Sequence, residues 1–226
     1  SPPEADKSRQ RRTGVPLRVT KNMPLPFSHI YYAEKIKKKI LKDKDIDEQD
    51  FFVGSTFPDI RYVLKKDREF THLNFKNSAE ILEKIKQEKD SFELGILCHL
   101  YTDYKFSEYW NYFKDHKDDY YPVLILENQL LFGQFNKNIK QILNYYCKEN
   151  FNKYGSTQKD VNEWNKIIKQ NISVKMNGEV FEKLAGGTMG AEEKWVEKVL
   201  KRYGEIKNNP KLIEKIKKFE SKLIKN

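Results

Sequence analysis

Cysteine and histidine are both scarce in this chain of 226 residues, which has two cysteines and four histidines. Cys98 and Cys147 lie far apart and form no Cys-x-x-Cys pair, so the chain has no disulfide framework and nothing in it requires an oxidising compartment. Cys98 stands in an apolar stretch, where we expect a buried thiol. Any metal site would therefore draw on histidines and carboxylates.

Long apolar runs are also absent. No stretch approaches the roughly 20 residues that a membrane-spanning helix needs. No charged-then-apolar leader with a small-residue cleavage site is seen either. We therefore expect a soluble, cytoplasmic protein without a transmembrane segment. Hydrophobic residues make up 38% of the chain, which is enough for the core of one ordinary domain.

Arginine is scarce although the net charge is +10, because lysine supplies most of the positive charge. The lysines are spread along the whole chain, whereas phosphate and base recognition depend more on arginine forks. We interpret the charge as a solvated surface and do not expect a nucleic-acid partner. A nucleic-acid-binding module is the weakest of the functions considered, since it rests on charge alone.

Residues 1–22 differ in composition from the rest of the chain. They are rich in arginine and proline and contain no aromatic residue, whereas Lys, Ile, Asn, Tyr and Phe dominate from Met23 onward. We expect Met23 to be the native start and the upstream segment to be an added, non-native extension. A disordered basic arm is the alternative. Residues 23–226 would then form the helical domain.

The body of the chain is predicted to be all-α. Valine and threonine are sparse, and an alternating strand pattern appears only at residues 171–175. Apolar residues recur every three to four positions, as in helices with one buried face. Capping residues, Gly54 and the prolines set the expected bounds: 28–42, capped by Ser28; 47–53, ended by Gly54; from 77 or 78; 90–112, capped by Asp90; 122–150; 158–170; 177–185; 191–203; and 209–225.

Two residues on the long predicted helix are spaced for chemistry. His99 and Asp103 are four positions apart, so both side chains project from one helix face and can reach one ion. The plainer explanation is a hydrogen bond between a core histidine and a carboxylate.

Three further residues are candidates of the same kind. Asp59 follows Pro58 at a break between helices, where it could equally be a turn or capping residue. His72 lies in an aromatic loop, where it could simply be packed. His29 begins the first helix, where the helix dipole favours a neutral ring that can ligate a metal or cap the helix.

The combination and order of these residues resemble the zinc-dependent phospholipase C family, which is related to all-α zinc nucleases acting on single strands. Four short strings carry the resemblance over roughly residues 23–110. They are Met23-Pro-Leu-Pro-Phe-Ser-His29, Phe52-Val-Gly-Ser-Thr-Phe-Pro-Asp59, Thr71-His72 and Leu94-Gly-Ile-Leu-Cys-His99-Leu-Tyr-Thr-Asp103-Tyr. Family members show a start of that kind, a Gly-Ser-x-x-Pro-Asp string, a Thr/Ser-His loop and a Gly-x-x-x-His-Leu-x-Thr-Asp helix.

The resemblance implies a metal cleft in a single helical bundle whose central long helix carries two of the ligands. The implied metal ligands are His29, Asp59, His72, His99 and Asp103, and the implied metal is zinc. Asp59 would bridge metal ions or act as the catalytic base. The reaction implied is hydrolysis of a phosphoester, with a phospholipid headgroup as one substrate of this class.

The chain departs from the family pattern after Asp103. Family members often carry a further histidine one turn later, where this chain has Ser107, and no later His-x-x-x-Glu pair exists because His116 is the last histidine. The fullest sites of the family hold three zinc ions, so we expect one or two here. The alternative hypothesis is a non-catalytic binding or scaffold protein on a degenerate phospholipase C-like fold.

Overall fold

The computed structural model describes residues 24–110, 113, 116, 119–134, 139, 143 and 151–223. These residues form helices joined by loops, and no strand occurs among them, which confirms the all-α prediction. The expectations for residues 1–22 and for Cys147 lie outside the described residues. No described helix is long and apolar enough to cross a membrane.

The first half of the described chain supplies α1 to α5. Their bounds are α1 Pro26–Ile40, α2 Glu48–Thr56, the 3-10 turn η1 Phe57–Ile60, α3 Arg61–Leu64, the 3-10 turn η2 Arg68–Phe70, α4 Ser78–Gln87 and α5 Ser91–Trp110. The second half supplies α6 Tyr120–Leu131, the 3-10 turn η4 Phe151–Tyr154, α8 Gln158–Ile172, α9 Gly178–Glu182, the π-turn η5 Lys183–Thr188, α10 Glu193–Ile206 and α11 Pro210–Leu223.

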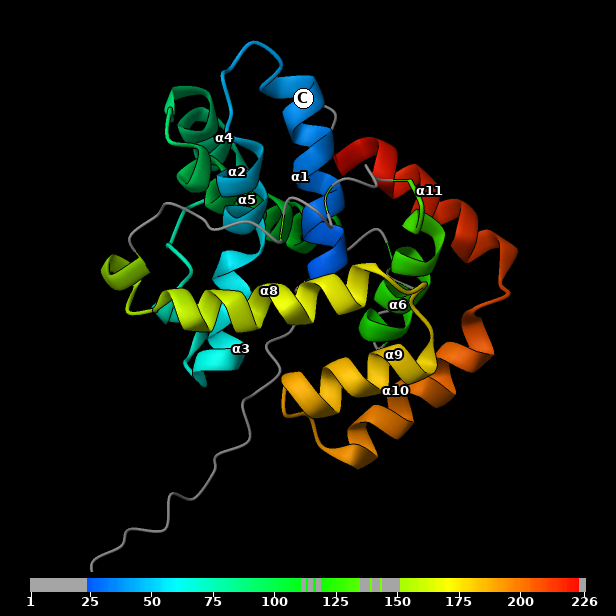
Figure 1. Cartoon of the computed structure of the whole chain (residues 1–226). Coiled ribbons are helices and arrows are strands. Elements are labelled where there is room, and N and C mark those ends of the chain that lie inside the picture. The colour runs from blue at the N-terminus through cyan, green and yellow to red at the C-terminus, as the bar shows by residue number, and fades with distance from the viewer. Residues whose placement is uncertain are drawn as a thin grey trace, which may run out of the picture.

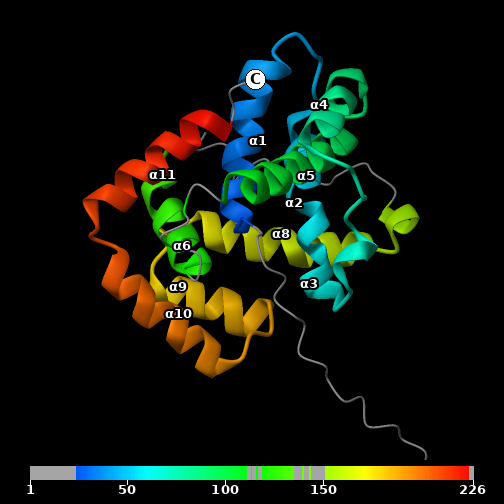
Figure 2. The ribbon, with the colours of Figure 1, turned by 180° about the vertical axis from the view of Figure 1, so that it is seen from behind.

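Helix α5 is the central long helix, as predicted. It packs against α2 most extensively and also against α1, α4 and α11 (Figures 1 and 2). Its side chains are buried on more than one face, among them Phe92, Leu94, Leu97, Leu100 and Tyr101. A helix that is apolar on several faces must be surrounded, because no face of it can be left to water.

Two glycines allow α2 and α5 to lie in backbone contact. A Cβ on Gly54 would stand 2.1 Å from the carbonyl oxygen of Phe92, and one on Gly95 would stand 2.2 Å from that of Phe51. The prediction that Gly54 ends its helix is therefore wrong, since α2 continues to Thr56. Gly54 is needed for close approach of two helices, not for a left-handed turn.

The first helix begins earlier than predicted. Pro26 lies in its first turn, where the fixed φ of proline suits a helix start, and Leu25 is the N-cap without a side-chain hydrogen bond. Ser28 is therefore not the cap. It lies inside α1, and its hydroxyl donates to the Glu127 carboxylate of α6 at 2.8 Å.

The predicted Asp90 cap is confirmed, and the two helices before it are capped in the same way. The Asp47 carboxylate accepts from the backbone N–H of Gln49 and Asp50 at the start of α2, and Asn77 caps α4. Asp90 accepts from the backbone N–H of Glu93 at the start of α5. In each case the side-chain oxygen satisfies a backbone donor that the first helical turn leaves without a partner.

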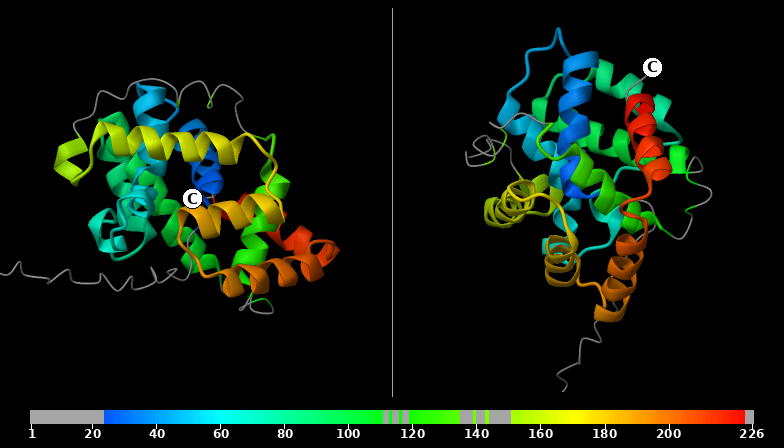
Figure 3. Two further views of the ribbon diagram at one scale, coloured as in Figure 1. Left: turned by 60° about the horizontal axis from the view of Figure 1, so that its bottom comes forward. Right: turned by 90° about the vertical axis from the view of Figure 1, so that its right-hand side faces the viewer.

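The second half of the chain packs against the first through α6 and α8 (Figure 3). The indole of Trp164 in α8 donates to the carbonyl of Thr56 at 2.9 Å, which ties α8 to the end of α2. Helix α6 ends at Leu131, well before the predicted 150, and the strand considered near residue 171 is instead the end of α8. Helix α10 covers α6 from the far side.

Candidate metal centre

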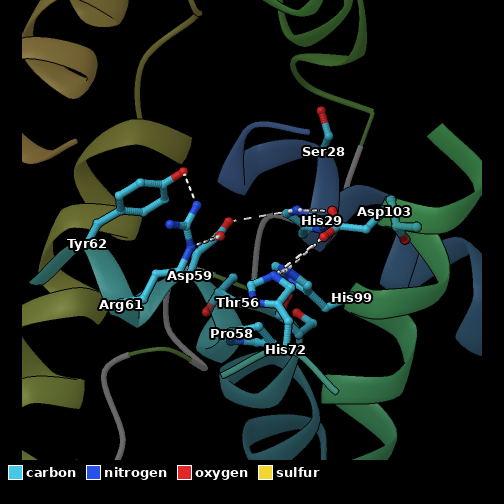
Figure 4. Close-up of polar contacts among 12 residues, drawn as sticks. Ser28, His29, Thr56, Pro58, Asp59, Arg61, Tyr62, His72, His99 and Asp103 are labelled. Carbon is cyan, nitrogen blue, oxygen red and sulfur yellow. Dashed lines mark hydrogen bonds and ion pairs between the residues drawn. The ribbon is translucent and has the colours of Figure 1, made fainter. Parts of the chain in front are cut away.

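Four segments of the first half place five candidate residues together (Figure 4). Helix α1 brings His29, and α5 brings both His99 and Asp103. Asp59 comes from η1, directly after α2, and His72 from the loop after η2. All five side chains are buried, with exposed fractions between 0% and 6%. A buried cluster of this composition has to be explained, because titratable groups are costly to remove from water.

The orientation of the His99 ring is fixed by α2. Its Nδ1 lies 3.0 Å from the carbonyl oxygen of Ser55, the residue after Gly54. Because a carbonyl only accepts, Nδ1 must carry the proton, and Nε2 is left with its lone pair directed into the cluster. The glycine contact between α2 and α5 thus brings the Ser55 carbonyl within reach of His99. Hydrogen bonding of the far nitrogen in this way is typical of metal-ligating histidines.

The His72 ring is held by a second relay of the same kind. The Thr71 hydroxyl donates to the carbonyl of Pro58 at 2.5 Å, so its oxygen is available to accept from His72 Nδ1 at 3.1 Å. Nε2 of His72 then also keeps its lone pair. The Thr-His string and the Pro-Asp string recognised in the sequence are therefore parts of one hydrogen-bonded unit.

The two lone pairs face each other. Nε2 of His99 and Nε2 of His72 are 3.3 Å apart, and neither can donate when both protons are on Nδ1. Asp103 Oδ2 stands 3.4 Å from Nε2 of His72 and 3.8 Å from Nε2 of His99. Two facing lone pairs beside a carboxylate oxygen repel one another unless a cation or a proton lies among them.

His29 completes the cluster from the other side. Its ring stacks on that of His99, with centroids 3.6 Å apart and an angle of 12° between the planes. Nε2 of His29 lies 3.5 Å from Asp103 Oδ1 and 3.8 Å from Asp59 Oδ2, and neither ring nitrogen has a hydrogen-bond partner. A fully buried imidazole without a hydrogen bond is rare, and its free nitrogens suit the binding of a metal ion.

Burial keeps the three imidazoles neutral. It lowers the pKa of His29 to about 4, lowers that of His72, and holds that of His99 well below its usual value, although the Asp103 charge opposes each shift. Neutral imidazole is the form that binds a metal. The histidines are thus ready to act as ligands near neutral pH.

The two carboxylates differ in their surroundings. Burial raises the pKa of Asp59 to about 7, against the opposing effect of the Arg61 guanidinium. Burial would also raise the pKa of Asp103, but interactions with its neighbours, of which Arg68 is the permanent cation, outweigh it and hold that pKa well below the usual range. Asp103 is therefore the permanent anion of the cluster.

The donor set fits a divalent transition-metal ion. Two groups of three have ligand atoms within 4.8 Å of one another: His29, His99 and Asp103, and Asp59, His72 and His99. His99 belongs to both. The side-chain atoms without a hydrogen-bond partner include both nitrogens of His29, Asp59 Oδ1 and Asp103 Oδ1. Imidazole nitrogens and carboxylate oxygens are the ligands that zinc takes in hydrolytic sites.

Comparison with family models gives a match over residues 28–226 to a model described as zinc-dependent phospholipase C. The chain belongs to the zinc-dependent phospholipase C family. Comparison with curated proteins and with solved structures finds no match. The family match spans the second half of the chain as well, beyond the region in which the sequence motifs were recognised.

Among the described side chains of α5, no further candidate ligand follows Asp103. The side chain of Ser107 is exposed, and Glu108 accepts from the hydroxyl and backbone N–H of Ser78. His116 bonds Asp119 at 2.7 Å, and among the described residues it belongs to no candidate metal group. The candidate centre therefore consists of the five predicted residues.

Two arginines at the centre were missed by the sequence reasoning. Arg68 in η2 bonds Asp103 Oδ2, and its side chain is 26% exposed. Arg61 in α3 lies with its Nε 3.9 Å from Asp59 Oδ1 and donates from Nη2 to the hydroxyl of Tyr62 at 2.6 Å. In the sequence both stand among other charged or aromatic residues, where nothing distinguishes them from surface cations.

Proposed function

We propose that this protein is a zinc-dependent phosphoesterase that hydrolyses a phosphodiester of the phospholipid class. The observation that carries the proposal is the pair of facing Nε2 lone pairs of His72 and His99, 3.3 Å apart beside Asp103. Family membership supports zinc as the metal and a phospholipid as the substrate. The five buried residues would hold one or two ions, in the two groups that share His99.

Zinc bound at this centre would lower the pKa of a water molecule and withdraw charge from the phosphoryl group. Asp59 would take the proton of that water. Its Oδ1 has no hydrogen-bond partner, and the side chain also lines a pocket with Tyr62, Tyr121 and Trp164. Asp59 thus lies between the candidate metal centre and a small, water-sized pocket, a position from which a general base can reach a metal-bound water.

The surroundings of the centre suit a lipid. The pocket beside Asp59 is also lined by apolar side chains, among them Leu25, Leu184 and Met189. Phe70 and Leu73, on either side of His72, are 41% and 58% exposed, and they are two of the three large hydrophobic side chains exposed among the described residues. Exposed apolar side chains beside a buried polar centre favour a substrate with an apolar part.

The test measures zinc and turnover in the same preparations. Protein reconstituted with zinc is assayed on bis(p-nitrophenyl) phosphate and on phosphatidylcholine vesicles, and zinc is counted by elemental analysis. We expect Asp59→Asn to lower turnover at least ~100-fold while the ion held by His29, His99 and Asp103 is retained, because a general base contributes about 10²–10⁴-fold. His116→Gln is the matched control and should keep wild-type turnover.

Three outcomes decide between the candidate functions. Less than ~0.2 zinc per chain after reconstitution would contradict the proposal that the protein is an enzyme, since zinc sites bind tightly. Zinc held without turnover on either substrate would favour the second candidate, a binding or scaffold protein on the same fold. The observation in favour of that candidate is that Arg61 and Arg68 already balance the charges of Asp59 and Asp103. Full turnover in Asp59→Asn would support the enzyme hypothesis but contradict the role of Asp59 as the general base.

A further inference from the structure

Arg68 differs from the other charged residues of the candidate centre in its exposure. Its side chain is 26% exposed, whereas those of Asp59, Asp103, His72 and Arg61 are at most 5% exposed. A polar substrate that approaches the centre from solvent therefore meets the Arg68 side chain before it meets the candidate ligands. A cation in this position attracts an anionic group.

The guanidinium of Arg68 borders the place where the lone pairs converge. Its Nη2 bonds Asp103 Oδ2, the same oxygen that lies 3.4 Å from His72 Nε2 and 3.8 Å from His99 Nε2. The backbone carbonyl of Arg68 also accepts from the N–H of His72 at 3.0 Å, so one turn of chain joins the two residues. Arg68 is thus fixed relative to the candidate ligands from both ends.

The second terminal nitrogen of Arg68 lacks an acceptor. Nη1 is buried and has no hydrogen-bond partner, although an unpartnered donor of a charged group is costly. An arginine fork suits the oxygens of a phosphoryl group, which accept from two parallel N–H donors. The acceptor that Nη1 lacks would be supplied by such an oxygen.

The charges of the centre agree with the binding of an anion beside Arg68. The carboxylates of Asp59 and Asp103 are already paired with the guanidinium groups of Arg61 and Arg68. A bound divalent ion would leave the centre with excess positive charge. An anion beside Arg68 compensates for that charge in a buried, weakly screened place.

We propose that Arg68 is the phosphate anchor of the centre: it binds a non-ester oxygen of the substrate's phosphoryl group through Nη1 while Asp103 holds the guanidinium in place. The proposal takes the class of ligand from the proposed function. Binding of phosphate needs no turnover, however, so the two proposals can fail separately.

The test uses inorganic phosphate as the probe and the zinc-reconstituted full chain as the protein. Binding is measured by titration calorimetry for wild type, Arg68→Gln, Arg68→Lys and the control Lys66→Gln. Lys66 is an exposed cation two residues away whose Nζ lies over the Phe70 ring, 5.4 Å from its centroid. Elemental analysis checks zinc content, and circular dichroism checks the fold.

We expect Arg68→Gln to weaken phosphate binding at least ~10-fold with zinc content unchanged, because one charge-assisted hydrogen bond and one charge are lost. The phosphate affinity of Arg68→Lys should lie between those of wild type and Arg68→Gln, since lysine keeps the charge without the fork. Lys66→Gln should change phosphate binding less than ~2-fold, because the charge of an exposed lysine is screened by salt.

Three results would overturn the assignment. Unchanged phosphate binding in Arg68→Gln is the first. An equal loss in Lys66→Gln is the second, since the effect would then be general electrostatics. Loss of zinc in Arg68→Gln and Arg68→Lys alike is the third, since Arg68 would then only support Asp103. If Arg68→Gln does not fold, the phosphate affinity of Arg68→Lys is compared with that of the wild type instead. An unchanged affinity would overturn the assignment. Phosphate binding that depends on Arg68 in a protein without hydrolytic activity would sustain this proposal and contradict the proposed function.

Discussion

Gly54 and Gly95 bring the backbones of α2 and α5 together: a Cβ on Gly54 would stand 3.2 Å from the Cα of Gly95, and one on Gly95 would stand 2.8 Å from the carbonyl carbon of Gly54. This contact also places the Ser55 carbonyl 3.0 Å from His99 Nδ1. Packing and metal chemistry are therefore joined at one helix crossing. A change at either glycine should affect both.

The first prediction concerns Gly95→Ala. The added methyl would overlap the backbone of Phe51 and Ser55, which no rotamer change can relieve. We expect a loss of about 3 kcal/mol or more in the free energy of unfolding, at the upper end of overpacking effects. Zinc affinity should fall as well, because His99 loses the carbonyl that fixes its tautomer. Urea denaturation and a zinc titration measure the two effects.

The matched control is Gly204→Ala in α10. Gly204 is exposed inside a helix, and a Cβ there would meet nothing within 4 Å. The substitution should leave stability unchanged or raise it by about 0.5–1 kcal/mol, because alanine is the better helix former. Equal stability of the Gly95 and Gly204 variants would contradict the account of the helix crossing.

The second prediction concerns the thermal effect of zinc. A metal that binds only the folded state stabilises it by about 2.7 kcal/mol at 100 times its Kd. For a chain of this size that is a rise in Tm of roughly 5–10 °C. Asp103→Asn should remove most of this rise, since Asp103 is the permanent anion among the candidate ligands. His116→Gln should keep the rise, and its loss there as well would show that zinc acts elsewhere.

Glu127 provides the third prediction, away from the metal centre. It is buried in α6, where its carboxylate accepts from the Tyr32 hydroxyl at 2.6 Å and from the Ser28 hydroxyl at 2.8 Å. Burial raises its pKa to about 7 from the ordinary 4.5, although both hydroxyl donors act in the other direction. Between these two pH values the folded chain binds a proton that the unfolded chain has released.

Stability should therefore fall as pH rises from about 4.5 to about 7, and level off above that, because the folded state must give up the proton. A raised pKa of this size corresponds to about 2–4 kcal/mol. Glu127→Gln removes the titration, so its stability relative to wild type should increase over this pH range. The measurement is urea denaturation of both proteins, free of zinc, at pH 5 and pH 8. If the free energies of unfolding of the two proteins differ by the same amount at both pH values, the raised pKa of Glu127 is contradicted.

The sequence was sufficient to predict which residues meet. The spacing of His99 and Asp103 places them on one helix face whatever the tertiary structure, and the order of the four strings predicted the rest of the cluster. The Asp90 cap of α5 was predictable because capping is local chemistry. Whether the five residues ligate zinc is still a prediction.

What the sequence did not reveal depends on contacts between distant segments. Gly54 was taken for a helix end because its role exists only where α5 crosses α2. Arg68 stands in a charged loop, and its pairing with Asp103 is a contact across 35 positions. Glu127 did leave a signal, since it is the one charged residue within the apolar helix from Tyr120 to Leu131. A charged residue in such an apolar run can be predicted to be buried and to have hydrogen-bond partners.

The last prediction separates lipid from soluble substrates. Phe70 and Leu73 are exposed beside buried His72, and neither is a candidate ligand. In the double variant Phe70→Ser, Leu73→Ser, we expect turnover of phosphatidylcholine vesicles to fall at least ~5-fold, because apolar area that would contact the lipid is lost. Turnover of bis(p-nitrophenyl) phosphate should stay within ~2-fold of wild type, since the metal centre is unchanged. Val174→Ser is the control, because Val174 is 48% exposed and follows the end of α8, which is not part of the loop that carries His72. An equal loss on both substrates would show that the two side chains support the loop and do not contact lipid.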